Sequence, residues 1–187
     1  YALGTSHTCA ETTAGLTCWG TFDGSNGLPP TAVRLPGLTA AALISAGGRD
    51  TCAGEGATIY CWGGGSDGDA GDGTFTERAG ATVAVADLPP VVALASGEQF
   101  TCAALAAGGL RCWGNNSHGQ LGTGVAATGF GPTRVGTGTD WVAVSAGDET
   151  TCGVTAAGAM SCWGANLRGE TGDTAPGPIV DEPRAVS

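Results

Sequence analysis

The stretch Leu94–Gly124, LASGEQFTCAALAAGGLRCWGNNSHGQLGTG, decides the fold because its pattern recurs along the whole chain. Its middle part contains a Thr-Cys pair and a Cys-Trp-Gly triplet, and it has three further copies, at Ser6–Gly20, Arg49–Gly63 and Glu149–Gly164. The first cysteine recurs after 43, 50 and 50 residues. Regular recurrence at this spacing indicates a repeat architecture, in which each unit packs on its neighbours.

A unit of this length, with short strands and a Trp-Gly pair, predicts an all-β fold, a β-propeller with about four blades. In the third copy we expect strands over Val91–Ala95, Thr101–Leu105 and Leu110–Gly114. The linkers that carry Leu88–Pro90 and Gly131–Thr133 are expected to supply outer edge strands, where proline is tolerated.

The repeat also predicts how the chain is divided. We expect one propeller region over residues 1–187, with units of about 1–37, 38–87, 88–137 and 138–187. Tyr1 aligns with Val144, so the first unit lacks most of its first strand, and the tail Pro183–Ser187 resembles Pro132–Val135 and would begin another unit. This favours a piece of a longer chain over a small closed propeller, or over open arcs that assemble through unpaired edge strands.

The eight cysteines form four pairs with gaps of 9, 9, 10 and 10 residues: Cys9 with Cys18, Cys52 with Cys61, Cys102 with Cys112, and Cys152 with Cys162. Cys102 and Cys112 are equally far from the turn centre at Ala107, which places them opposite each other on antiparallel strands, within reach of a disulfide. We predict one disulfide per unit, with buried free thiols as the alternative. No Cys-x-x-Cys motif occurs, which disfavours zinc or haem. Disulfides indicate an extracellular, cell-surface or periplasmic location.

The tryptophans are predicted to fill the space between blades. Neighbours on one strand face opposite sides, so the Trp that follows each second cysteine lies on the face away from the disulfide. We expect four such residues in the core, with exposed stacking platforms for sugars as the alternative: Trp19, Trp62, Trp113 and Trp163. Trp141 has no counterpart in the other copies, where Ala41 and Val91 stand, so it is a candidate surface residue for binding, with packing in the core as the alternative.

Composition narrows the range of partners. The chain has 35 Gly and 9 Pro, which excludes long helices, and no apolar run approaches the ~20 residues of a transmembrane helix. Seventeen acidic residues against seven Arg, with no Lys, give a net charge of −10. An acidic surface argues against nucleic acid or an anionic membrane as partner. The lysine-free, Ala-, Gly- and Thr-rich composition suggests a bacterial source.

The two histidines do not predict catalysis. His7 occupies a repeat position also filled by Asp50, Phe100 and Thr150, and such varied occupants indicate a structural position. His118 occupies a turn position filled elsewhere by an aspartate. No nucleophile elbow, P-loop or dinucleotide fingerprint stands in a strand–helix context. We therefore expect no catalytic residue and no enzyme.

A glycine-rich turn concentrates carboxylates at Asp67, Asp69 and Asp72. Oxygen ligands suit calcium, so calcium is the one cofactor that the sequence suggests, and otherwise no cofactor is expected. The alternative is a tight turn, which Asp and Gly also favour.

The pattern Ser-Ala-Gly, Thr-Cys-Ala, Cys-Trp-Gly-x-Asn and Gly-Gln-Leu-Gly-x-Gly resembles the regulator of chromosome condensation repeat family, with the third copy most similar. The second and fourth copies deviate in the turn. The paired cysteines look like a bacterial, exported branch of the family. The resemblance implies a propeller, typically of seven blades, whereas four Cys-Trp units are present here. Guanine nucleotide exchange, the family's best-known activity, does not suit an acidic, disulfide-bonded chain.

These observations predict a non-catalytic, secreted or cell-surface scaffold that binds proteins through loops at one rim, where the repeats vary most. Expected partners are proteins, or further copies joined through edge strands, with no nucleic acid and no transmembrane segment. The alternative function is a lectin-like, carbohydrate-binding domain. Its stacking residues would be Trp141 and the linker aromatics Phe22, Phe75 and Phe130.

Overall fold

The structure, a computed structural model, describes residues 1–21, 33–34, 38, 41–55, 57–64, 66–75, 78–85, 87–125, 128–173 and 177–186, with the backbone alone for 33–34, 78–83 and 130. The described residues form sixteen β-strands and no helix. Four antiparallel sheets of four strands result, and the strands of each sheet follow chain order. We call these sheets blades 1 to 4.

The strands of each blade fall inside one of the four predicted units. Blade 1 contains β1 (Ala2–Leu3), β2 (His7–Thr12), β3 (Gly15–Gly20) and β4 (Val33–Arg34). Blade 2 contains β5 (Leu43–Ala46), β6 (Asp50–Glu55), β7 (Thr58–Gly63) and β8 (Arg78–Ala84). Blade 3 contains β9 (Val91–Ser96), β10 (Phe100–Leu105), β11 (Leu110–Gly114) and β12 (Gly129–Arg134). Blade 4 contains β13 (Trp141–Ala146), β14 (Thr150–Thr155), β15 (Met160–Ala165) and β16 (Ile179–Ala185).

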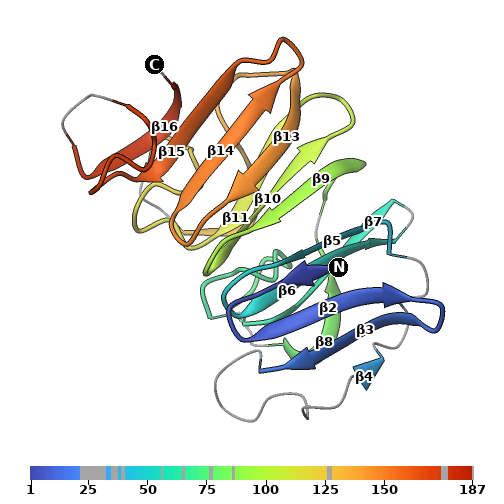
Figure 1. The fold of residues 1–187 in the computed structure, drawn as a ribbon. Helices are drawn as coiled ribbons and strands as arrows, with labels where there is room; N and C mark the ends of the chain where they lie inside the picture. The colour runs from blue at the N-terminus through green and yellow to red at the C-terminus, as the bar shows by residue number, and fades with distance from the viewer. Residues whose placement is uncertain are drawn as a thin grey trace.

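The blades stand side by side in an arc, with blade 1 at one end and blade 4 at the other (Figure 1). The first strands of successive blades, β1, β5, β9 and β13, lie next to one another and line a common axis. The all-β, partial propeller predicted from the repeat is therefore what the structure shows. No helix with the length and hydrophobicity needed to cross a membrane occurs in the described part of the chain.

The linkers supply the outer strands, as the sequence predicts, and only the tail differs from its prediction. Gly131–Thr133 lies in the outer strand β12, and the linker that carries Leu88–Pro90 supplies β8, although Leu88–Pro90 itself forms no strand and leads into β9. The outer strand of blade 2 is β8, which pairs with β7. The tail also completes a blade rather than beginning one, because Arg184 and Ala185 pair with Cys162 and Ser161 of β15.

The hairpin register explains the cysteine spacing. Within each blade the two cysteines are direct cross-strand partners on the second and third strands. Their Cα atoms are 4.1 Å apart in each blade, which belongs to the close type of antiparallel pair, without backbone hydrogen bonds between the two residues. No free cysteine remains. The four disulfides join the predicted partners: Cys9 with Cys18, Cys52 with Cys61, Cys102 with Cys112, and Cys152 with Cys162.

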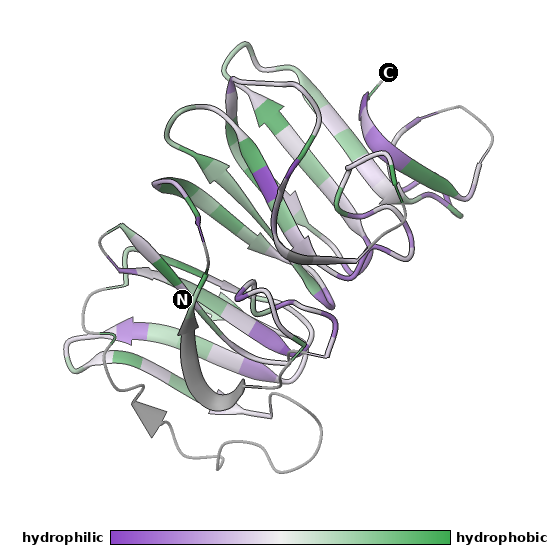
Figure 2. Ribbon diagram, turned by 180° about the vertical axis from the view of Figure 1, so that it is seen from behind, coloured by the Kyte–Doolittle hydropathy of each residue, from purple (hydrophilic) through white to green (hydrophobic). Residues whose placement is uncertain are grey.

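The core lies between blades rather than within them. The clusters join Leu16 to Trp62 across blades 1 and 2, Ile59 to Trp113 across blades 2 and 3, and Leu110 to Trp163 across blades 3 and 4. Figure 2 shows the hydrophobic residues along the strands. Trp19 is half-buried because no described blade precedes it, whereas the other three tryptophans of the repeat are fully buried. Each blade therefore depends on its neighbours for burial.

The pairing predicts how the native protein reacts with a thiol label. We expect no labelling of the oxidised chain and eight labels after denaturation and reduction, as read from intact mass. Each bridge closes a short loop and should contribute ~3 kcal/mol or less, so a variant that combines Cys102→Ser with Cys112→Ser should fold with reduced stability. Labelling of all eight cysteines without reduction would contradict the pairing.

Candidate functional site

Each blade presents two chemically different faces. The upstream face, toward the preceding blade, carries the Thr of Thr-Cys opposite the Trp of Cys-Trp-Gly, as in the pair Thr151 and Trp163. The downstream face, toward the following blade, carries the disulfide and the Gly-rich turn. Trp163 Nε1 and Thr151 Oγ1 donate to the same carbonyl, that of Gln120 in blade 3, at 2.9 and 2.8 Å. Trp113 Nε1 likewise donates to the carbonyl of Asp69 in blade 2 at 2.9 Å.

The residue before the Thr of Thr-Cys, which is His7 in blade 1 and Asp50 in blade 2, also contacts the following blade. Thr51 Oγ1 of blade 2 lies 2.6 Å from His7 Nε2 of blade 1, and Thr101 Oγ1 of blade 3 donates to Asp50 Oδ2 of blade 2 at 3.1 Å. In blade 3 the equivalent residue is Phe100, whose side chain cannot accept a hydrogen bond. Thr151 of blade 4 therefore donates to the Gln120 carbonyl instead. The position is therefore structural, as predicted, although the sequence did not indicate its cross-blade partner.

Burial shifts the pKa of three of these groups. Burial raises the pKa of the Asp50 carboxyl well above its usual range, and the nearby Asp69 carboxylate adds to the effect. Burial likewise raises the pKa of Asp69 to about 6, and it lowers the pKa of His7 to about 4. Asp50 Oδ1 and Asp69 Oδ1 accept no hydrogen bond in the described part of the protein. The interface of blades 2 and 3 thus buries two acids that hold a proton to higher pH than an exposed aspartate does.

The loops between the first and second strands of the blades surround one end of the axis. Successive loops are joined by backbone hydrogen bonds from Thr5 N to the Gly47 carbonyl, from Gly48 N to the Gly97 carbonyl and from Glu98 N to the Asp148 carbonyl. They enclose a hollow of about 290 Å³, which we call the axial mouth. Its lining includes the acids Glu98 and Asp148, both exposed, and no basic residue. Leu3, 67% exposed, adds an apolar edge.

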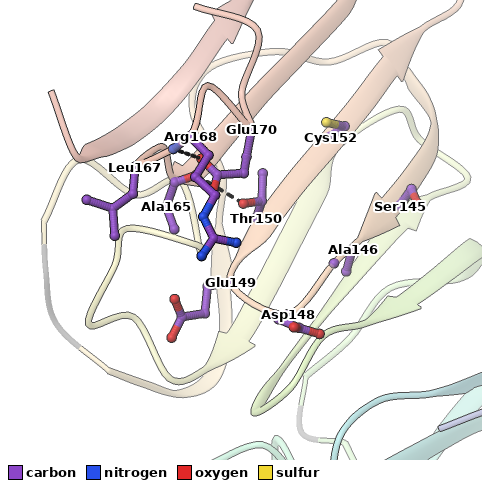
Figure 3. A pocket seen from close by; sticks show the side chains of 11 residues that line it. Ser145, Ala146, Asp148, Glu149, Thr150, Cys152, Ala165, Leu167, Arg168 and Glu170 are labelled. Atoms are coloured by element: carbon purple, nitrogen blue, oxygen red, sulfur yellow. Dashed lines mark hydrogen bonds between the residues drawn. The ribbon is translucent and has the colours of Figure 1, made fainter. Parts of the chain in front are cut away.

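A larger hollow of about 670 Å³ lies on the downstream face of blade 4, which no described blade covers. Figure 3 shows Arg168, Leu167 and Glu170 of the turn beside Glu149 and Thr150. The Arg168 backbone N–H donates to the Glu170 carboxylate at 2.7 Å, which lowers the pKa of Glu170. In blades 2 and 3 the equivalent surface is an inter-blade interface.

Trp141 is a core residue, so of the two interpretations of this position core packing is confirmed and the surface binding role is not. It is 6% exposed, and its ring meets that of Trp163 edge-on at a centroid distance of 6.0 Å. A Cβ at Gly153 would lie 2.6 Å from Trp141 Cζ3. The other copies carry Ala at this position (Ala10, Ala53 and Ala103), so the missing methyl group makes room for the indole. A Trp at position 141 together with a Gly at position 153 is therefore the feature of the sequence that indicates burial of Trp141.

The remaining aromatic candidates are only partly placed. Phe22 lies outside the described residues, as does the side chain of Phe130, whose backbone belongs to β12. Phe75 is 54% exposed in the linker after the turn of blade 2. It is the one linker aromatic with a described side chain.

The three aspartates suggested for calcium have separate surroundings. Asp67 Oδ1 accepts from Asn115 Nδ2 of blade 3 at 3.3 Å, and Asp69 is buried. Asp72 Oδ1 accepts from the backbone N–H and the hydroxyl of Thr74. Within the described ranges, no three His, Cys, Asp or Glu side chains form a group that could hold a metal ion. Calcium binding stays a prediction from the sequence.

One exposed cluster resembles a catalytic arrangement in composition. Ser117 Oγ and Glu149 Oε1 both lie near His118 Nδ1, at 3.1 and 3.2 Å. A Ser–His–acid relay needs the two partners on different ring nitrogens, since the proton passes through the ring. Because both contacts use Nδ1, this geometry provides no such relay.

The buried acids predict an effect of pH on stability. A raised pKa means that the Asp69 contribution to stability is complete below about pH 4 and is lost as pH rises to about 6. We expect Asp69→Asn to gain stability relative to the wild type over this interval, measured by urea unfolding at each pH. Asp181→Asn, at an exposed position, should follow the wild type. A constant difference between Asp69→Asn and the wild type across the interval would contradict the assignment.

Trp141 and Gly153 should show energetic coupling. Gly153→Ala should destabilise by about 1–3 kcal/mol through overpacking, and Trp141→Val should destabilise by leaving a cavity. The double variant restores the combination that blade 3 has at Val91 and Ala103, so it should be more stable than the sum of the two changes predicts. Unfolding free energies measure the cycle, and additive effects would show that the residues do not share one space.

Comparison with known proteins agrees with the repeat. A sequence profile described as the regulator of chromosome condensation (RCC1) repeat matches residues 91–120 and 141–170, and a second profile of the same description matches residues 107–154. Comparison with curated protein sequences gives no significant match.

Three solved structures are similar in fold. Human WBSCR16 matches with a TM-score of 0.85 and 19% identity, over 100% of this chain and 53% of that chain. Yeast RCC1 (Prp20), in a crystal with Kap60, matches with a TM-score of 0.83 and 21% identity, over 100% of this chain and 48% of that chain. The CRINKLY WD40 ectodomain of the Arabidopsis thaliana receptor kinase ACR4 matches with a TM-score of 0.51 and 22% identity, over 97% of this chain and 52% of that chain. The chain spans about half the length of each. The profiles thus identify regulator of chromosome condensation repeats within residues 91–170, and the solved structures show that the four-blade arc has the fold of such propellers.

Proposed function

We propose that this chain is a non-catalytic scaffold module that binds proteins at the axial mouth. The main support is that the loops around the mouth share one backbone arrangement, while the residue after the loop glycine differs from blade to blade. The loop glycine repeats as Gly4, Gly47, Gly97 and Gly147, while the next position holds Thr5, Gly48, Glu98 and Asp148. The backbone hydrogen bonds between loops keep the frame rigid, and variable residues on a rigid frame are typical of binding surfaces.

The charge of the mouth favours a basic partner. Glu98 and Asp148 are exposed at its edge without a lining Lys, Arg or His, and the chain carries a net charge of −10. Leu3 offers apolar contact beside them. A peptide segment with a basic side chain next to an apolar one therefore fits the mouth by charge and by surface.

The location that we propose is an oxidising one, outside the cell, at its surface or in the periplasm. Four disulfides support this, since they persist in such compartments. A similar arc also occurs in a receptor-kinase ectodomain. Protein binding is supported by the yeast RCC1 structure, in which that protein is bound by Kap60. The carbohydrate alternative retains Phe75 as its single described exposed ring, so we favour protein binding.

The test is a selection of peptides from a random displayed library against the oxidised wild-type chain. We expect enrichment of segments with Lys or Arg beside an apolar residue, and affinity that falls with added salt. Glu98→Lys should weaken the enriched peptide by about tenfold because it reverses a charge at the mouth.

The control is Asp181→Lys, which makes the same charge change on the outer strand β16 and should bind like the wild type. Equal binding by both variants would contradict the axial mouth as the site. Recovery of reduced protein from the cytoplasm of the source organism would contradict the proposed location.

A further inference from the structure

The interface between blades 2 and 3 contains an apolar hollow of about 230 Å³. It lies inside the arc, since blade 2 also packs on blade 1 and blade 3 also packs on blade 4. Its walls come from both blades: Leu43, Gly54, Ile59 and Val91. Leu43 and Val91 begin the strands β5 and β9, so the hollow lies at the opposite end of these strands from the axial mouth.

The lining of the hollow offers no polar side chain. The described residues that line it are Ala, Leu, Ile, Val or Gly. Two backbone carbonyls of the lining are already used, because Gly54 accepts from the Ala42 N–H at 3.0 Å and Ile59 accepts from the Val85 N–H at 2.8 Å. Water therefore finds few partners there. The hollow favours an uncharged, apolar occupant, since a charge would lose its hydration without compensation.

The interface of blades 3 and 4 holds an aromatic ring at the corresponding end. Trp141 stands where blade 3 has Val91. It shares an apolar cluster with Ala104 and Leu110, which are cross-strand partners in blade 3. The molecule thus shows that an indole can lie between two of its blades at this level.

Blade 2 differs from blade 3 in two ways that leave space. Gly54 and Ile59 are its corresponding cross-strand partners, and Gly54 has no side chain. A Cβ there would lie 3.0 Å from Ile59 Cδ1 and 3.4 Å from Leu43 Cβ. The hairpin of blade 2 is also one residue shorter, since its cysteines are 9 residues apart and those of blade 3 are 10 apart.

Blade 3 closes part of the space with its own side chains. Leu88 stands where blade 4 has Gly138, the glycine beside Trp141 Nε1, and it packs on the cluster that joins blades 2 and 3. The hollow is what remains open. Because the two blades are sheets that face each other, the space between them suits a flat ring. An apolar cavity of about 150 Å³ binds benzene, so the hollow has room for a fused ring.

We propose that this hollow binds one small, uncharged aromatic molecule of the size of indole. The ring lies between Gly54 and Ile59 of blade 2 and Val91 of blade 3, and it continues the apolar cluster that joins these blades. Val91 already holds the chain position from which Trp141 enters its interface, so the ring comes from solvent as a separate molecule. Its entrance is formed by exposed residues: Ala42, Ala57 and Val92.

The experiment titrates the oxidised chain, with ¹³C-labelled isoleucine methyl groups, with indole as the probe. The chain has three isoleucines, all of them described, and of these Ile59 lines the hollow. We expect a saturable shift of the Ile59 methyl signal. Ile44 packs on the other face of blade 2 and Ile179 lies in blade 4, so their signals should stay unchanged. No shift of Ile59, or equal and non-saturating shifts of all three signals, overturns the proposal.

Two variants fill the hollow from opposite sides. Val91→Phe adds a ring from blade 3, and Gly54→Val adds the side chain that blade 4 carries at the corresponding position, Val154. Each should weaken the binding of indole by about tenfold or more, because the space is occupied. Val142→Phe makes the matched change at a residue of β13 that is 51% exposed, and it should bind like the wild type.

The signals of Ile44 and Ile179 report whether each variant is folded. The two filled variants act from different strands, so misfolding of one leaves the other as the test. Wild-type affinity in a folded variant of either kind overturns the proposal.

N-acetyltryptophanamide distinguishes a free ligand from a tryptophan side chain of a partner protein. It carries the same ring with a peptide group on each side, and we expect it to bind no more tightly than indole, since these groups stay in solvent. Tighter binding would assign the hollow to a side chain and overturn the free ligand. Glu98→Lys alters the axial mouth and should leave the binding of indole unchanged, so the two proposals fail independently.

Discussion

The fold depends on a contact in which side chains of one blade donate to a backbone carbonyl of the blade before it. Trp163 and Thr151 share the carbonyl of Gln120, and Trp113 uses that of Asp69. Because the acceptor is backbone, the identity of the turn residue is free and only the turn shape is fixed. At Gly122, with φ of +67°, a Cβ would lie 2.6 Å from Trp163 Nε1, so glycine is required both for the turn and for the approach of the indole. The shape of one turn thus places the next blade.

This arrangement explains why the copies diverge where they do. Each blade is held together locally by its hairpin and disulfide, and it meets each neighbouring blade through an apolar cluster and a few hydrogen bonds. Histidine, aspartate and phenylalanine can therefore occupy one repeat position, provided that the Thr of the next blade finds a hydrogen-bond partner. Trp141 likewise replaces a small residue because Gly153, on the adjacent strand, gives up a methyl group. Compensation takes place between neighbours and leaves the other blades unchanged.

The sequence predicted the features that depend on short-range geometry. The distance of Cys102 and Cys112 from a central turn sets their register, so spacing alone placed the disulfides. Features set by contact between blades were harder to predict. The burial of Trp141 depends on a residue twelve positions away, and the Thr101–Asp50 hydrogen bond joins residues 51 positions apart. The linker that carries Leu88–Pro90 supplies the outer strand of blade 2, as predicted, but the prolines follow β8 and do not lie in it, so they did not mark the bounds of the strand.

The three interfaces also differ in how they respond to protons. Blades 1 and 2 meet at His7, whose lowered pKa means that acid weakens this interface. Blades 2 and 3 meet at Asp50 and near Asp69, whose raised pKa values mean that acid strengthens it. Blades 3 and 4 meet at Phe100, at the shared carbonyl of Gln120 and, nearer the surface, at the pair of His118 and Glu149. The responses of these first two interfaces to acid therefore have opposite sign and partly offset each other in the stability of the whole chain. The repeat pattern therefore fixes the shape of the arc, and the residues at one variable position determine how the first two interfaces respond to acid.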